Sequence, residues 1–110
     1  PPKIIETNFQ EDGEIWWLID TGVPHLVAIR DDIREFDIEQ ARSLRHKYNC
    51  NVNICKPEQD ILWVRTYERG VEDETLACGT GMVACFVRCH QEGLLDDMVK
   101  FIYSIFQTNI

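Results

Sequence analysis

The chain contains 110 residues, 45% of them hydrophobic, and carries a formal net charge of −8. This length accommodates one small domain, residues 1–110, with a single core and no room for a second. The excess of acidic residues argues against nucleic acid or an anionic membrane as a partner. No apolar stretch approaches the ~20 residues that span a bilayer, and no signal peptide opens the chain, so we expect a cytoplasmic protein.

The five cysteines follow no regular spacing, which predicts reduced thiols rather than a disulfide framework. Two groups invite comparison with zinc sites, one formed by Cys50 and Cys55 and the other by Cys85, Cys89 and His90. Neither contains the paired Cys-x-x-Cys spacing of common zinc sites, so we expect no metal site. The four cysteines of these groups are interpreted as small core residues.

Hydrophobic patterning predicts an α+β fold with six strands and two helices. The strands are expected at residues 3–8, 14–20, 25–30, 51–55, 61–67 and 99–106, and residues 56–60 are expected to form a turn. Asp37 is expected to cap a surface helix that ends at Tyr48, with Gln40 at the capping-box position. A second helix, from about residue 81 to 91, carries an apolar stripe wide enough to be largely buried. We therefore expect a mixed, mostly antiparallel sheet curled around a central helix.

The chemistry of the chain is concentrated just before this second helix. The segment 77–81 reads Ala-Cys-Gly-Thr-Gly, so a thiol, that of Cys78, directly precedes a helix start. A helix N-terminus presents backbone N–H groups without intrahelical acceptors and a partial positive charge, so it binds anions and lowers the pKa of a nearby thiol. Gly79 and Gly81 leave this backbone uncovered. The pattern predicts an anion-binding loop with a thiolate at its edge.

Three strings together resemble the diaminopimelate epimerase family. They are Glu-Arg-Gly-Val followed by Glu-Thr-Leu-Ala-Cys-Gly-Thr-Gly at 68–71 and 74–81, Thr-Gly-Val-Pro-His at 21–25, and Asn-Val-Asn-Ile at 51–54. The resemblance implies an epimerase without metal or pyridoxal phosphate, whose substrate is the small molecule diaminopimelate. It also implies a fold of two similar halves, each wrapped around a central helix, with the active site between them.

The resemblance implies a role for each matching residue. Cys78 is expected to be an acid–base thiol that exchanges a proton with the substrate α-carbon, and the backbone N–H groups of Gly79 and Thr80 are expected to hold the adjacent carboxylate. His25 is expected to lie beside the site and tune the thiol. The distal end of the substrate is expected to meet three side chains: Glu68, which accepts from an ammonium, Arg69, which pairs with a carboxylate, and Asn51. The resemblance also counts Glu68 among the catalytic residues, with Cys78 and His25.

The chain departs from the family pattern in three ways. Val23 stands where many members carry an Asn that contacts the distal carboxylate, and Asp73 is a one-residue insertion. The larger departure is that full-length members use two cysteines, one from each half, whereas this chain has one such loop. The resemblance covers residues 21–93 well and the ends poorly. We therefore expect the C-terminal half of an epimerase, truncated at both ends, which needs an N-terminal half-domain as partner and is inactive alone.

Two other functions remain open from the sequence. The chain could be a binding or interaction domain that kept the anion loop and lost catalysis, as Val23 and the missing half suggest. It could also be half of a racemase for another amino acid, although a monocarboxylate substrate would leave Arg69 without its carboxylate. The sequence does not decide whether the chain forms a homodimer.

Overall fold

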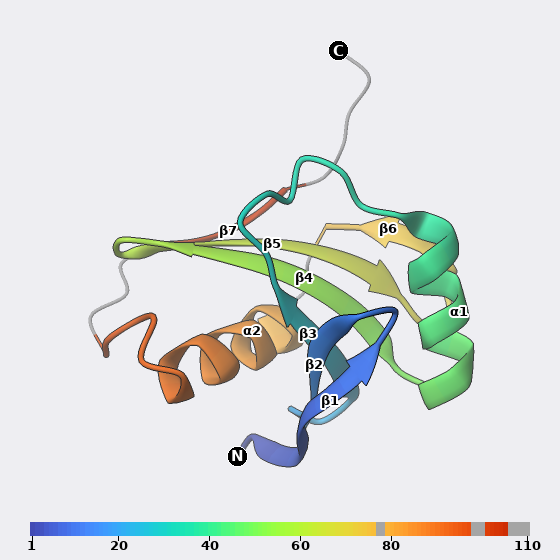
Figure 1. The fold of residues 1–110 in the computed structure, drawn as a ribbon, viewed down its shortest axis with the longest axis horizontal. Helices are drawn as coiled ribbons and strands as arrows, with labels where there is room; N and C mark the ends of the chain where they lie inside the picture. Colours follow the sequence, from blue (N-terminus) through green and yellow to red (C-terminus); the bar gives the residue numbers. More distant parts are fainter. Residues whose placement is uncertain (77–78, 98–100, 106–110) are drawn as a thin grey trace.

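The computed structural model describes residues 1–76, 79–97 and 101–105. It confirms the α+β class and the mostly antiparallel sheet (Figure 1). The helices are α1 (Ile38–Tyr48) and α2 (Gly79–Gln91). In the described residues the strands are β1 (Lys3–Glu11), β2 (Glu14–Asp20), β3 (Pro24–Ile29), β4 (Asn51–Glu58), β5 (Ile61–Glu68), β6 (Asp73–Thr75) and β7 (Phe101–Ser104).

The strands of the described residues form one open sheet in the order β1-β2-β3-β4-β5-β6. All neighbours on this path are antiparallel except β3 and β4, which run parallel and are connected through α1. β4 occupies one edge of β5 over almost its whole length. The other edge is therefore shared: β7 pairs in parallel with residues 61–64, and β6 pairs with residues 66–68.

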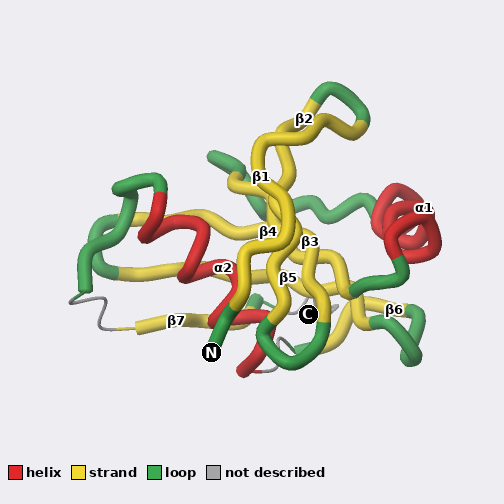
Figure 2. The backbone as a smooth tube through the Cα atoms, turned by 90° about the horizontal axis from the view of Figure 1, so that it is seen from below, coloured by secondary structure: helices red, strands yellow, loops and turns green. Residues whose placement is uncertain are grey.

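The two helices pack on opposite faces of this sheet (Figures 1 and 2). Neighbouring residues on a strand point to opposite faces, and the core follows this alternation. Trp16 packs in the cluster beneath α1, whereas Trp17 packs in the cluster beneath α2. The fully buried residues of β3 divide in the same way, with Leu26 on the α1 side and Val27 on the α2 side. The sheet is thus the shared middle layer, and α2 crosses the face formed by β2 to β5.

The surface helix α1 begins as its sequence predicts. Asp37 is the N-cap, and its carboxylate accepts a hydrogen bond from the Gln40 N–H at 3.1 Å. The side chain of Gln40 does not close a capping box, because it bonds Asp12 and Arg30 instead. These two contacts connect α1 to the β1–β2 turn and to the end of β3. The helix ends at Tyr48, and its C-cap, Asn49, adopts a left-handed conformation with φ of 51°.

The structure differs from the sequence prediction at several strand boundaries and by one additional strand. The expected turn at residues 56–60 is wrong in its first half, because β4 continues through Pro57 and turns only at Gln59-Asp60. Pro57 lacks an N–H, but β3 pairs with β4 only as far as Cys55, so this part of β4 has a free edge that tolerates proline. The sequence did not predict β6, whose three residues, Asp-Glu-Thr, lack any hydrophobic alternation.

Two further expectations have a partial outcome. β7 occupies residues 101–104 of the last predicted strand, and residues 99, 100 and 106 of that prediction lie outside the described residues. In the described part of the chain, no helix is long and apolar enough to cross a membrane.

Candidate active site

Two of the predicted site residues are neighbours across the parallel pair of strands. His25 near the start of β3 lies opposite Asn51 at the start of β4. The Asn51 amide donates to the Pro24 carbonyl at 3.2 Å, and its oxygen accepts from the Arg69 backbone N–H at 2.9 Å. Asn51 is buried and therefore connects the start of β3 to the turn that follows β5. In this structure it positions the backbone of Arg69, a role that the sequence did not indicate.

The imidazole of His25 is fully buried and reaches the first turn of α2. Its Nε2 lies 3.1 Å from the hydroxyl Oγ1 of Thr80, and its Nδ1 lies 2.9 Å from the amide nitrogen of Asn53. Asn53 is also fully buried, and its oxygen accepts a hydrogen bond of 2.7 Å from the Thr66 hydroxyl. A chain of polar side chains thus runs from β5 through β4 and β3 to α2, inside an otherwise hydrophobic interior.

Burial lowers the pKa of His25 to about 4. Removal from water disfavours the imidazolium, the positive charge of Arg69 acts in the same direction, and the carboxylate of Asp20 opposes both. Near neutral pH the ring is therefore uncharged. His25 therefore contacts α2 as a neutral hydrogen-bonding group.

The first turn of α2 lies directly on this polar chain because position 81 is a glycine. A Cβ on Gly81 would meet the Asn53 oxygen at 2.9 Å and His25 Cε1 at 3.4 Å. A second contact holds the same turn from the side, since the Thr21 hydroxyl donates to the Thr80 carbonyl at 3.0 Å. Gly79, by contrast, is exposed, and a Cβ there would meet nothing within 4 Å.

Cys78, the central residue of the sequence prediction, lies outside the described residues together with Ala77. The structure describes the residues on either side of this pair. β6 ends at Thr75, and α2 begins at Gly79, so residue 78 directly precedes the first helical residue. The backbone N–H groups of Gly79 and Thr80 belong to the first turn of α2, where helix geometry provides no intrahelical acceptor. Gly79 and Thr80 also line an open depression of about 710 Å³ together with Asp20, Thr21 and Val83.

Two of the three residues predicted for the distal end of the substrate, Glu68 and Arg69, lie at the end of β5. Glu68 is half-buried, and its carboxylate accepts from the Thr75 hydroxyl of β6 at 3.0 Å. Arg69 is half-buried as well, and its Nη1 donates to the Asn49 carbonyl at 2.7 Å. Arg69 is joined to the His25 region through its backbone bond to Asn51. Asp73, the inserted residue, is exposed at the start of β6.

A buried ion pair that the sequence did not predict supports the strand before Cys78. The guanidinium of Arg65 on β5 and the carboxylate of Glu74 on β6 form two hydrogen bonds, of 2.7 and 2.6 Å, with 1% and 8% of the side chains exposed. Arg65 also donates to the carbonyls of Ile33 and Arg34. Glu74, the first residue of the matching string at 74–81, is therefore held by Arg65. The sequence feature that could have indicated this pair is Arg65 itself, a charged residue within the otherwise mostly apolar strand β5.

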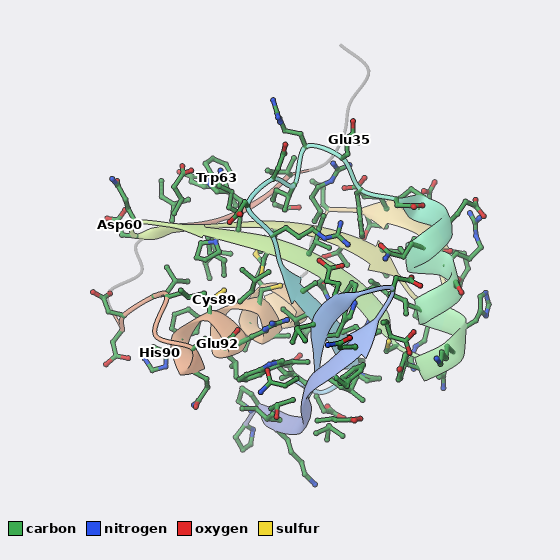
Figure 3. The ribbon with its side chains drawn as sticks, viewed as in Figure 1. Glu35, Asp60, Trp63, Cys89, His90 and Glu92 are labelled. Carbon is green, nitrogen blue, oxygen red and sulfur yellow. The ribbon has the colours of Figure 1, made fainter. Side chains whose placement is uncertain are left out.

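The four described cysteines are buried thiols without disulfides, as predicted. Cys50 packs on the α1 side of the sheet and Cys55 on the α2 side, so these two do not form a pair. Cys55 lies 3.8 Å from Cys89, whose sulfur is on the side of α2 that faces the sheet in Figure 3. Burial raises the pKa of Cys50 to about 12. In the described residues no group of three His, Cys, Asp or Glu side chains could hold a metal ion.

Comparison with known proteins places the chain in a family. A sequence model of the family described as diaminopimelate epimerase matches residues 17–104. The chain is 52% identical to a diaminopimelate epimerase of Nitratiruptor sp. over 103 residues, and this matched segment makes up 92% of this chain and 41% of that relative. It is 58% identical to a diaminopimelate epimerase of Campylobacter lari over 99 residues, and this matched segment makes up 88% of this chain and 40% of that relative.

The chain belongs to the diaminopimelate epimerase family, as its motifs indicated. It spans about two fifths of the length of these relatives, 41% of one and 40% of the other. A diaminopimelate epimerase of Helicobacter pylori is 49% identical over 81 residues, which cover 70% of this chain and 30% of that relative.

Replacement of Gly81 tests the close approach of α2 to the polar chain. In the Gly81→Ala protein the new methyl group meets Asn53, whose side chain is held by three hydrogen bonds and is fully buried. Overpacking of this kind costs about 1–3 kcal/mol of unfolding free energy, measured by urea denaturation. Gly79→Ala is the matched control: its methyl group meets nothing, and alanine's higher helix propensity leaves stability unchanged or slightly raised. Equal stability of the two variants would contradict this geometry.

The lowered pKa of His25 predicts a loss of stability on acidification. Between about pH 6.5 and pH 4 the unfolded chain binds a proton at His25 that the folded chain excludes, so unfolding free energy falls as pH falls. The lost contribution reaches about 3 kcal/mol by pH 4. The His25→Gln protein should lose this part of the pH dependence, whereas His46→Gln, at an exposed position, should keep it. An unchanged slope in His25→Gln would show that His25 protonates freely in the folded protein.

Proposed function

We propose that this chain is one half of a cofactor-independent epimerase that interconverts LL- and meso-2,6-diaminopimelate, a step toward lysine and peptidoglycan precursors. The observation that carries the proposal is the family match across residues 17–104, which includes the Ala-Cys-Gly-Thr-Gly string. The position of Gly79 and Thr80 in the first turn of α2 supports it, because these backbone N–H groups suit a carboxylate.

In the proposed reaction, proton transfer at the α-carbon uses two thiols. The thiolate of one cysteine removes the α-proton, and the thiol of the other delivers a proton to the opposite face of the carbon. Cys78 is one of these groups, and the second comes from an N-terminal half-domain that lies against this one. The α-carbon beside a carboxylate is weakly acidic, so the developing negative charge must be stabilised. The N–H groups of Gly79 and Thr80 serve that purpose at the positive end of α2.

Recognition of the distal end of the substrate is assigned to the end of β5. Glu68 accepts from the substrate ammonium, and Arg69 pairs with the distal carboxylate. Asn51 supports this pair because its side chain already holds the Arg69 backbone N–H at 2.9 Å. Val23 supplies no hydrogen-bond donor from its side chain, so the distal carboxylate depends more heavily on Arg69. The family match does not favour a degenerate binding domain or a racemase for another amino acid.

The test is exchange of the substrate α-proton, followed by proton NMR of diaminopimelate in D₂O under reductant. This chain is used alone, and then with the N-terminal portion of the Campylobacter lari relative, with association checked by size-exclusion chromatography. We expect exchange only when both parts are present, and its loss in Cys78→Ala.

Two results would contradict the proposal. Exchange by this chain alone would mean that one thiol and another base suffice, so the half-enzyme argument would fail. No exchange by associated parts would instead favour a binding domain.

A further inference from the structure

The hydrogen-bond chain beneath α2 has only one consistent direction. The carbonyl oxygen of Leu26 can only accept, and it lies 3.0 Å from the terminal atom assigned as the Asn53 nitrogen. The amide of Asn53 must therefore place its NH₂ group toward Leu26 and His25, and its oxygen toward the Thr66 hydroxyl. One N–H of Asn53 donates to Leu26, and the other points to His25 Nδ1.

This direction determines the protonation of the imidazole. Because Asn53 donates to Nδ1, that nitrogen carries no proton, and the single proton of the neutral ring resides on Nε2. Nε2–H then donates to Thr80 Oγ1 at 3.1 Å. The hydroxyl proton of Thr80 is thus directed away from His25. An imidazole held in this way cannot take up a second proton without losing its bond from Asn53.

We propose that Asn53 is a positioning residue for the epimerase reaction, which fixes His25 as the Nε2–H tautomer and so makes it a permanent donor to the first turn of α2. His25 then works as a fixed hydrogen-bond donor rather than as a proton relay for Cys78. This role rests on the proposed function, but the tautomer itself does not. The polar chain is buried, so water does not compete for these bonds.

The charged groups around His25 leave this assignment intact. Asp20 favours a proton on the ring, whereas burial and Arg69 oppose it, and the balance keeps the ring neutral. The helix contributes as well: Thr80 lies at the positive end of α2, which disfavours an imidazolium there. Gly81 allows the contact, because any side chain at that position would separate α2 from Asn53 and His25.

The test reads the tautomer and the reaction separately. Long-range proton–nitrogen NMR of the chain labelled with ¹⁵N-histidine distinguishes a protonated ring nitrogen from an unprotonated one, with His25→Gln used to assign the signal among the three histidines. At neutral pH we expect His25 to carry its proton on Nε2. A proton on Nδ1, or on both nitrogens, would overturn the proposal whatever the activity.

Two variants of similar shape then separate positioning from folding. Asn53→Leu removes the donor to Nδ1 and should release the tautomer, with α-proton exchange in the reassembled enzyme falling at least about tenfold. Thr66→Val removes only the bond to the Asn53 oxygen, so the tautomer and exchange should persist, since Leu26 still orients the amide.

A released tautomer with undiminished exchange in Asn53→Leu would refute the positioning role. If Asn53→Leu does not fold, loss of the Nε2–H form in Thr66→Val would refute the orientation by Leu26. Absence of exchange in the unsubstituted assembly, with the Nε2–H form present, would refute the proposed function alone.

Discussion

The close contact between the first turn of α2 and the buried polar chain of the sheet is the constraint on which the site depends. Gly81 allows the helix to approach this closely because it has no side chain. His25 is hydrogen-bonded to Thr80 of the helix and to Asn53 of the sheet, and these bonds replace bonds to water. An unpaired polar group in such an interior costs about 1–3 kcal/mol, which favours the one arrangement in which these groups are paired. The helix N-terminus is consequently fixed in position and in direction. That is what an anion-binding loop requires, because preorganised donors do not have to move as charge develops.

Two buried arginines stabilise the layers on either side of this contact. Arg65 pairs with Glu74 and accordingly holds β6, the strand before residues 77 and 78, against β5. Arg88 holds α2 against the sheet. Its guanidinium donates to the carbonyls of Ile15 and Val27 and lies over the Trp17 ring. It also pairs with Glu92, one helical turn later. Loss of one partner from the buried Arg65–Glu74 pair would leave an uncompensated charge, which is strongly destabilising. The position of α2 is thus determined at both of its ends.

The sequence predicted much of this fold because strand alternation and helix capping are local properties. Asp37 capped α1 as expected, and the strands with hydrophobic alternation were recovered. The failures arose where a polar residue is buried by partners distant in the chain. Arg88 faces the sheet among Ala84, Cys85 and Cys89, although the helical pattern assigned that face to apolar residues only. The hydrogen-bond partners of the Asn53 side chain lie on two other strands, β3 and β5, so no spacing in the sequence indicates its role.

The central claim is that the N-terminus of α2 activates Cys78, and the rate of alkylation of each cysteine as a function of pH tests it most directly. Peptide mapping after brief iodoacetamide treatment gives these rates, with Cys78→Ser as the control. The account predicts one reactive cysteine, Cys78, with a midpoint below the ~8.5 of an ordinary thiol. Cys50, Cys55 and Cys89 should not react, because burial contributes to raising the pKa of each thiol. A midpoint for Cys78 at or above that ordinary value, or equally fast labelling of Cys50, would contradict the account.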